Sequence, residues 1–135
     1  MIHILNELKQ ALIDNGCENV YLAYDALPVE KKGKYFTVIA LKSFETTVPV
    51  YSLTMVYIPF SAELEINVTA PEGSTMEELC NYYDEKIRDA VVKISGSSSY
   101  MSRLTLNADK KINRLVITAV MTVGGMRKIS REELS

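Results

Sequence analysis

The chain has 135 residues, of which 47% are hydrophobic and 24% charged, and its formal net charge is −2. These values are typical of one globular domain and exclude a largely disordered chain, and the weak negative charge does not favour binding to nucleic acid or to an anionic membrane. No run approaches the roughly 18 apolar residues of a membrane span. The N-terminus lacks the basic segment and cleavage site of a signal peptide. Cys17 and Cys80 belong to no motif. We therefore expect synthesis in the cytoplasm, with both thiols reduced.

The first predicted element is a helix over residues 2–14. Its apolar stripe consists of leucines at helical spacing, Leu5, Leu8 and Leu12. Asn15-Gly16 supplies the left-handed stop that ends many helices. Residues 20–24 are a short apolar run, which predicts an edge strand.

A loop and a strand are predicted next. Residues 25–34 contain Pro28 and three lysines, which indicates a loop. Residues 35–44 are rich in β-branched and aromatic side chains and are almost continuously apolar. This composition is typical of a strand that is covered on both faces.

Residues 46–60 form the least usual segment, because they are apolar, almost uncharged and contain Pro49 and Pro59. Proline cannot donate a hydrogen bond to a sheet, so the ends of the segment should lie at edges or turns. An exposed, uncharged β segment of this length is an aggregation hazard. We therefore expect it to be buried, either within this domain or by another subunit.

The best-defined stretch follows. Apolar and polar residues alternate over 62–69, which predicts a strand with one buried face. Ser74 occupies the N-cap position of a predicted helix over 75–94, and Glu77 completes a capping box. The apolar stripe of that helix includes Cys80, which predicts a buried free thiol.

The last predicted elements are a β-hairpin and a tail. Residues 102–108 and 114–123 alternate in polarity and are joined by a charged turn, which predicts two antiparallel strands. Gly124-Gly125 is expected to end regular structure. Residues 124–135 then form a tail hinged at these glycines, in which residues 130–133 are a candidate for one helical turn.

These elements occur in the order α-β-β-β-α-β-β. Runs of strands with two helices predict an α+β fold, in which a mostly antiparallel sheet of four to five strands carries two helices packed on it. We expect residues 1–123 to form a single domain with an apolar β extension at 46–60, followed by the tail at 124–135.

Side chains suited to catalysis are scarce. His3 is the only histidine and lies at the start of a helix, so neither a zinc site nor a histidine base is indicated. Glu63 and Glu65 are neighbours on one strand face and could bind a metal or act as an acid/base pair, although a solvated strand face is the favoured interpretation. Lysines in the loops are too few for a nucleic-acid surface. We predict no catalytic residue, no cofactor and no metal, and therefore no enzyme.

In length, order and spacing the chain resembles the tail terminator (tail completion) proteins of long-tailed bacteriophages and prophages. The likeness is one of pattern and involves no diagnostic motif. The parts that carry it are the helix at 2–14, the strand at 35–44, the strand at 62–69 that ends in Ala70-Pro71, the helix at 75–94 and the hairpin at 102–123. The apolar character of 46–60 and the tail after Val123 depart from the family pattern.

The resemblance implies a small α+β subunit that assembles into a hexameric ring in the virion tail. The ring would cap the tail tube, stop its polymerisation and present a surface to the head connector. It would let DNA pass without recognising its sequence, and would have no enzymatic activity, cofactor or membrane.

A ring made from one surface repeated head to tail needs two different patches on each subunit. The sequence offers residues 46–60 and the C-terminal tail as these patches. The predicted interface residues are Tyr51, Leu53, Met55, Tyr57, Ile58, Met126 and Ile129. A weaker hypothesis places Glu63 and Glu65 on a surface that faces the DNA channel, where negative charge would keep DNA from adhering.

Other functions stay open at this stage. The chain could be another tail, baseplate or connector component with a related fold. It could also be a small-molecule or peptide-binding α+β module, with residues 46–60 lining a pocket. A hydrolase that uses only the carboxylates of Glu63 and Glu65 is the least favoured alternative.

Overall fold

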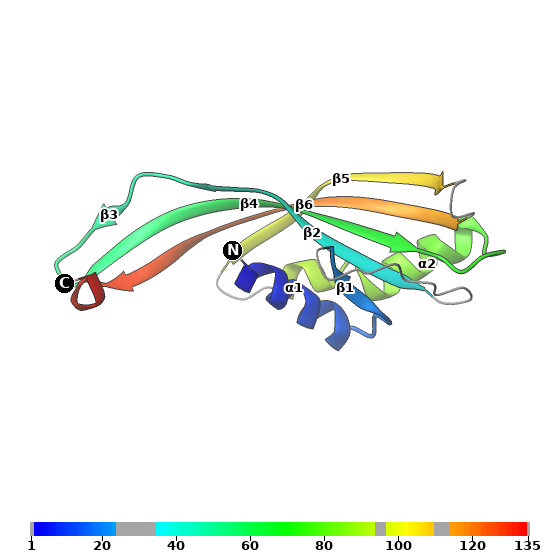
Figure 1. Cartoon of the computed structure of the whole chain (residues 1–135), viewed down its shortest axis with the longest axis horizontal. Helices are drawn as coiled ribbons and strands as arrows, with labels where there is room; N and C mark the ends of the chain where they lie inside the picture. Colours follow the sequence, from blue (N-terminus) through cyan, green and yellow to red (C-terminus); the bar gives the residue numbers. More distant parts are fainter. Residues whose placement is uncertain (1, 24–34, 94–96, 110–113, 135) are drawn as a thin grey trace.

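The fold is described by a computed structural model, which covers residues 2–23, 35–93, 97–109 and 114–134 (Figure 1). Within these residues six strands form one sheet, and both α-helices lie on the same side of it. In chain order the elements are α1 (Ile2–Asp14), β1 (Val20–Leu22), β2 (Phe36–Thr46), β3 (Val50–Tyr51), β4 (Met55–Thr69), α2 (Met76–Lys86), the 3₁₀ helix η1 (Ala90–Lys93), β5 (Ser97–Asp109), β6 (Arg114–Ser130) and the 3₁₀ helix η2 (Arg131–Leu134).

The strands follow the order β1-β2-β4-β6-β5, and β3 pairs with β4 beyond the end of β2. All pairs are antiparallel except β1 with β2, which are parallel. The predicted α+β class is therefore confirmed, whereas the predicted strand count and order are wrong in detail. The difference arises at residues 46–60, which contain the short strand β3 and the start of β4 rather than one strand. The loop predicted at 25–34 and the side chain of His3 lie outside the described part of the chain.

The hydrophobic core lies between the helices and one face of the sheet. The alternation predicted for residues 62–69 is confirmed, because Ala62, Leu64, Ile66 and Val68 are each at most 1% exposed. The leucine stripe of α1 packs into the same core. α1 has the predicted bounds, and Gly16 has the expected positive φ of 95° after the helix end.

β2 is buried on one face only. Thr37 and Ile39 are fully buried, whereas Val38 and Ala40 on the opposite face are partly exposed. The expectation that this strand is covered on both faces is wrong, because the described helices cover a single face of the sheet (Figure 1).

α2 is shorter than the predicted helix over 75–94. Thr75, and not Ser74, is its N-cap, and its hydroxyl accepts a hydrogen bond of 3.2 Å from the backbone N–H of Glu78. The helix ends at Lys86, and the chain turns before η1, which packs against α1. Ile87 of this turn and Ala90 and Val91 of η1 are still buried, so the apolar periodicity continues across a break that no glycine or proline marks.

The burial predicted for the Cys80 thiol is wrong. Cys80 is only partly buried, whereas Cys17 is 8% exposed. Cys80 lies at the margin of the buried face of α2, whose centre is formed by Leu79 and Tyr83. No helix within the described ranges is long and apolar enough to cross a bilayer.

Candidate functional site

The most distinctive feature of the fold is an arm that projects from one end of the sheet (Figure 1). We use the term arm for residues 47–60, which include β3 and the start of β4, together with residues 124–134 of β6 and η2. β4 and β6 have 15 and 17 residues, whereas β2 ends at Thr46 and β5 begins opposite Gly125. Five residues of β4, Met55 to Pro59, therefore continue beyond the body, which corresponds to a projection of roughly 17 Å.

The arm replaces the glycine-hinged tail that the sequence indicates. Gly124 and Gly125 do not end regular structure, because they pair with Ser61 and Phe60 inside an unbroken β4–β6 ladder that continues to Ser130. Pairing with a long neighbouring strand keeps the two glycines extended. The two segments that the sequence offers as separate patches thus form a single structure.

The tip of the arm is closed by hydrogen bonds. The backbone N–H and the hydroxyl of Ser52 donate to the carbonyl of Met55, at 2.9 and 3.1 Å, which forms a tight turn with Leu53 at its apex. Arg131 of η2 folds over this turn. Its backbone N–H donates to the carbonyl of Thr54 at 2.9 Å, and its Nη1 donates to the carbonyl of Ser52 at 2.8 Å.

Side chains on one face of the arm form a small packed cluster. Val56 is 2% exposed, and its cross-strand neighbours are Tyr51 and Ile129. The guanidinium of Arg131 lies over the Tyr51 ring, 5.7 Å from its centroid. At the base of the arm the Phe44 and Phe60 rings stack 5.5 Å apart. The arm is therefore a structured element with packing of its own.

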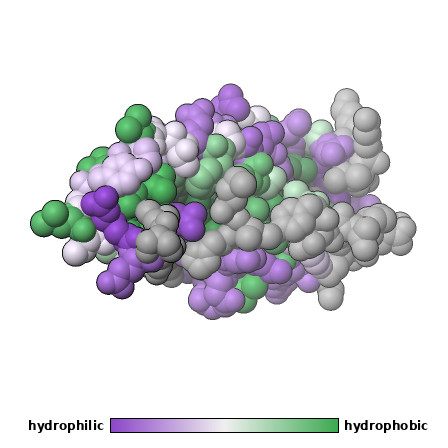
Figure 2. Space-filling view, turned by 60° about the vertical axis from the view of Figure 1, so that its left-hand side comes forward, coloured by the Kyte–Doolittle hydropathy of each residue, from purple (hydrophilic) through white to green (hydrophobic). Residues whose placement is uncertain are grey.

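Large apolar side chains nevertheless remain exposed on the arm. Leu53 is 94% exposed and Tyr51 is 64% exposed. The other exposed apolar side chains of the arm are Val48, Val50 and Met126. Figure 2 shows hydrophobic surface at the left-hand end of the molecule, which contains the arm. Large apolar side chains that gather in exposed positions on one element commonly mark an interaction site.

The structure places all seven predicted interface residues on the arm. Tyr51, Leu53 and Met126 are exposed. The others are partly buried, namely Met55, Tyr57, Ile58 and Ile129. Sequence reasoning missed Val48 and Val50 as interface residues, although both belong to the segment whose apolar, uncharged composition indicated the site.

Glu63 and Glu65 both lie on the face of the sheet that no described helix covers. Glu65 belongs to a polar ladder across three strands: it accepts a hydrogen bond of 2.8 Å from Nδ2 of Asn67 and pairs with Nζ of Lys42 at 3.3 Å. Asn67 in turn accepts a hydrogen bond of 2.7 Å from Thr118. The bond from Asn67, together with Lys42, lowers the pKa of Glu65. A carboxyl group held in its charged form is poorly suited to act as a general acid.

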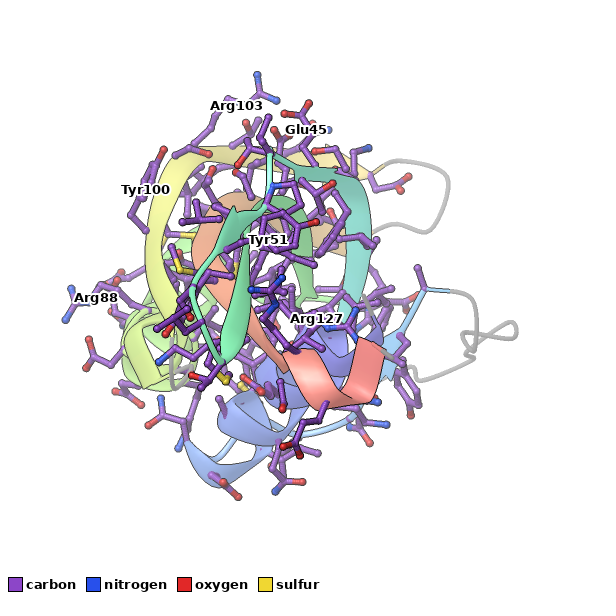
Figure 3. All side chains as sticks on the ribbon, turned by 90° about the vertical axis from the view of Figure 1, so that its left-hand side faces the viewer. Glu45, Tyr51, Arg88, Tyr100, Arg103 and Arg127 are labelled. Carbon is purple, nitrogen blue, oxygen red and sulfur yellow. The ribbon has the colours of Figure 1, made fainter. Side chains whose placement is uncertain are left out.

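A second surface with exposed apolar residues lies on one flank of the body. β5 is an edge strand, paired with β6 on one side and with no strand of the described residues on the other. Tyr100, Leu104 and Leu106 of β5 are 61%, 43% and 45% exposed. β5 contacts η1 on this flank, and Tyr100 points outward on the same side as Arg88 when the molecule is viewed along the arm (Figure 3). We call this surface the β5 flank. The sequence indicated a hairpin here but not that its first strand is an edge.

One pocket lies at the end of the body that contains the N-terminus of α2. It measures about 320 Å³ and is lined by Pro71, Gly73, Ser74, Ala108, Asp109, Arg114 and Leu115. The arm contributes none of these lining residues, so the expectation that residues 46–60 line a pocket receives no support from it. Among the described residues, no three His, Cys, Asp or Glu side chains are grouped closely enough to hold a metal ion.

Comparisons with family models and with curated protein sequences give no significant match to this chain. The fold and surfaces define an α+β protein with a projecting arm that carries exposed apolar residues.

Proposed function

We propose that this protein is a structural subunit that assembles into a ring through its arm, as a tail terminator of a long-tailed phage or prophage. The observation that carries the proposal is the arm itself, whose apolar residues project from the body while β4 and β6 stay paired as far as Met55 and Ser130. Leu53 at 94% exposure is suited to burial against another protein, because covering a leucine side chain contributes about 2 kcal/mol.

The arrangement of the site favours assembly over catalysis. The exposed apolar residues lie on a projecting element that points away from the hydrophobic core (Figure 1). The best-placed carboxylate, Glu65, is engaged in a ladder of structural hydrogen bonds. A ligand-binding module would instead be expected to enclose its apolar residues in a cavity.

The phage tail assignment rests on the resemblance in order, length and spacing. In this proposal the protein is made in the cytoplasm and becomes part of the virion tail. Its partners are copies of itself, in a ring of six, together with the tail tube and the head connector. DNA passes through the ring, and the uncovered sheet face with Glu63 and Glu65 is the candidate channel surface. A baseplate or connector subunit is the nearest alternative and would use the same arm.

The experiment that tests this function is the molar mass in solution as a function of concentration, by light scattering. We expect the wild-type chain to form an oligomer as its concentration rises, and Leu53→Asp and Tyr57→Asp to shift the protein toward the monomer. Ile13→Asp is the matched control, because Ile13 is 44% exposed on α1, away from the arm. A wild-type protein that stays monomeric at every concentration, or variants with unchanged mass, would refute arm-mediated assembly.

A further inference from the structure

The β5 flank provides the second patch that a head-to-tail ring requires. The two segments expected to act as separate patches are paired with each other in the arm, so they supply one patch and leave the other unassigned. Among the described residues, the exposed large apolar side chains outside the arm are Ile13 on α1 and three on β5. Of the three on the edge strand β5, Leu104 and Leu106 point to the helix-covered face, because their cross-strand partners Ala119 and Ile117 belong to the core. Tyr100, opposite Thr122, points to the other face.

The backbone of β5 is also suited to receive another chain. β5 has 13 residues, and its outer edge is not paired with any strand that the structure describes. The opposite edge strand, β1, has only three residues. A long edge strand presents a row of N–H and C=O groups that can pair with an incoming strand, and natural proteins usually protect such edges.

The charges of the two surfaces are complementary. The arm contains Arg127, Lys128 and Arg131 together with Glu132 and Glu133, which gives it a formal charge of +1. α2 contacts β6 on the face of the sheet to which Leu104 and Leu106 point, and it has four acidic residues and one lysine, which gives −3. Opposite potentials on two surfaces favour their association and disfavour arm-to-arm pairing, which would bring like charges together.

We propose that the arm of one copy docks on the β5 flank of the next copy. The apolar residues of the arm pack against Leu104 and Leu106 on the helix-covered face of β5, and Arg127 and Lys128 face the acidic side of α2. This inference rests on the proposed self-assembly and specifies its geometry. Because the two surfaces differ, each copy offers one arm and one flank, and the contact repeats until a ring closes.

The test uses two variants and their mixture. An arm variant, Leu53→Asp, keeps an intact flank, whereas a flank variant, Leu104→Asp with Leu106→Asp, keeps an intact arm. Each alone should be monomeric, with association at least about tenfold weaker than in the wild type. Mixed in equal amounts, they should form a dimer and nothing larger, because only one productive contact exists per pair. Ile13→Asp, at an exposure similar to that of Leu104, should assemble normally.

If the aspartates on β5 disturb folding, charge reversals at exposed positions provide a second test of the arm-to-flank contact. Glu77→Lys with Glu85→Lys on exposed positions of α2 should weaken assembly, and Arg127→Glu with Lys128→Glu in the same chain should restore it. Circular dichroism of each variant establishes that it is folded. If the charges meet, added salt should weaken the assembly of the wild type and of the chain with both reversals, but not that of the chain reversed on α2 alone.

The possible results separate this inference from the proposed function. If flank variants assemble as well as the wild type, the arm docks elsewhere, and the inference is overturned while self-assembly stands. If the two monomeric variants do not form a dimer when mixed, or the charge reversals do not rescue each other, the arm-to-flank contact is likewise refuted. If the wild-type chain does not associate at all, the proposed function fails, and the inference fails with it.

Discussion

Two leucines of this chain should respond to the same substitution in opposite ways. Leu64 is fully buried in β4, where its cross-strand neighbours are Leu41 and Met121, whereas Leu53 at the tip of the arm is 94% exposed. Replacing a buried leucine by alanine removes its transfer free energy and leaves a cavity, at a cost of about 2–5 kcal/mol. A substitution at an exposed position usually changes stability by less than about 0.5 kcal/mol.

We therefore expect Leu64→Ala to lower the free energy of unfolding by about 3 kcal/mol and Tm by roughly 10 °C. Leu53→Ala should leave both nearly unchanged but weaken assembly. The assay is urea unfolding followed by circular dichroism, at protein concentrations low enough to keep the chain monomeric, because assembly would itself raise the apparent stability. If Leu53→Ala destabilised the dilute monomer as much as Leu64→Ala does, Leu53 would be packed within its own chain, and the argument from the arm would be refuted.

Three further outcomes follow from local contacts. Thr75→Ala should lower the free energy of unfolding by about 1 kcal/mol, because it removes the hydroxyl that caps the N–H of Glu78; Thr75→Ser should retain most of it, and equal losses in the two would contradict the cap. Burial raises the pKa of Cys17 to about 11, so an alkylating reagent should modify Cys80 before Cys17 at pH 8. Mass spectrometry of the digested protein measures this order, and modification of Cys17 first would contradict the prediction. The same shift predicts that stability falls as pH rises from about 9 to 11, because the thiol ionises in the unfolded chain before it does in the folded one; a flat profile for wild type, or an unaltered fall in Cys17→Ala, would contradict this.

The part of the fold that the sequence predicts well is the part held together by periodic burial. The leucine stripe of α1 and the alternation at Ala62–Val68 are strong local patterns, and both correspond to the hydrophobic core. The hairpin of β5 and β6 is also confirmed, although both strands extend beyond the predicted bounds. Each of these elements has one face in the core between the helices and the sheet, so its apolar pattern follows directly from its position.

Strand length was harder to predict, because it depends on pairing between distant residues. Gly124-Gly125 has the composition of a break, but β4 provides a partner for every residue of β6 from Val116 to Ser130. The ladder therefore overrides the local preference of glycine. The break after Lys86 has the opposite cause: the helical pattern continues, but packing of η1 against α1 turns the chain.

The candidate site was predictable in composition but not in arrangement. The apolar, uncharged character of residues 46–60 indicates a surface that needs a partner, and the structure places Tyr51 and Leu53 on an exposed arm. The β5 flank has no comparable signal, because a strand's position at a sheet edge depends on the order of all the strands. Leu104 and Leu106 alternate with polar residues just as the buried strands do.

The most direct test of the central claim is native mass spectrometry of the purified wild-type chain at rising concentration. The account predicts one closed species of fixed stoichiometry, and a ring of six 15.2-kDa chains would have a mass of about 91 kDa. Leu53→Asp should abolish this species and leave the monomer. A wild-type protein observed only as a monomer, or a closed species that persists in Leu53→Asp, would contradict the account.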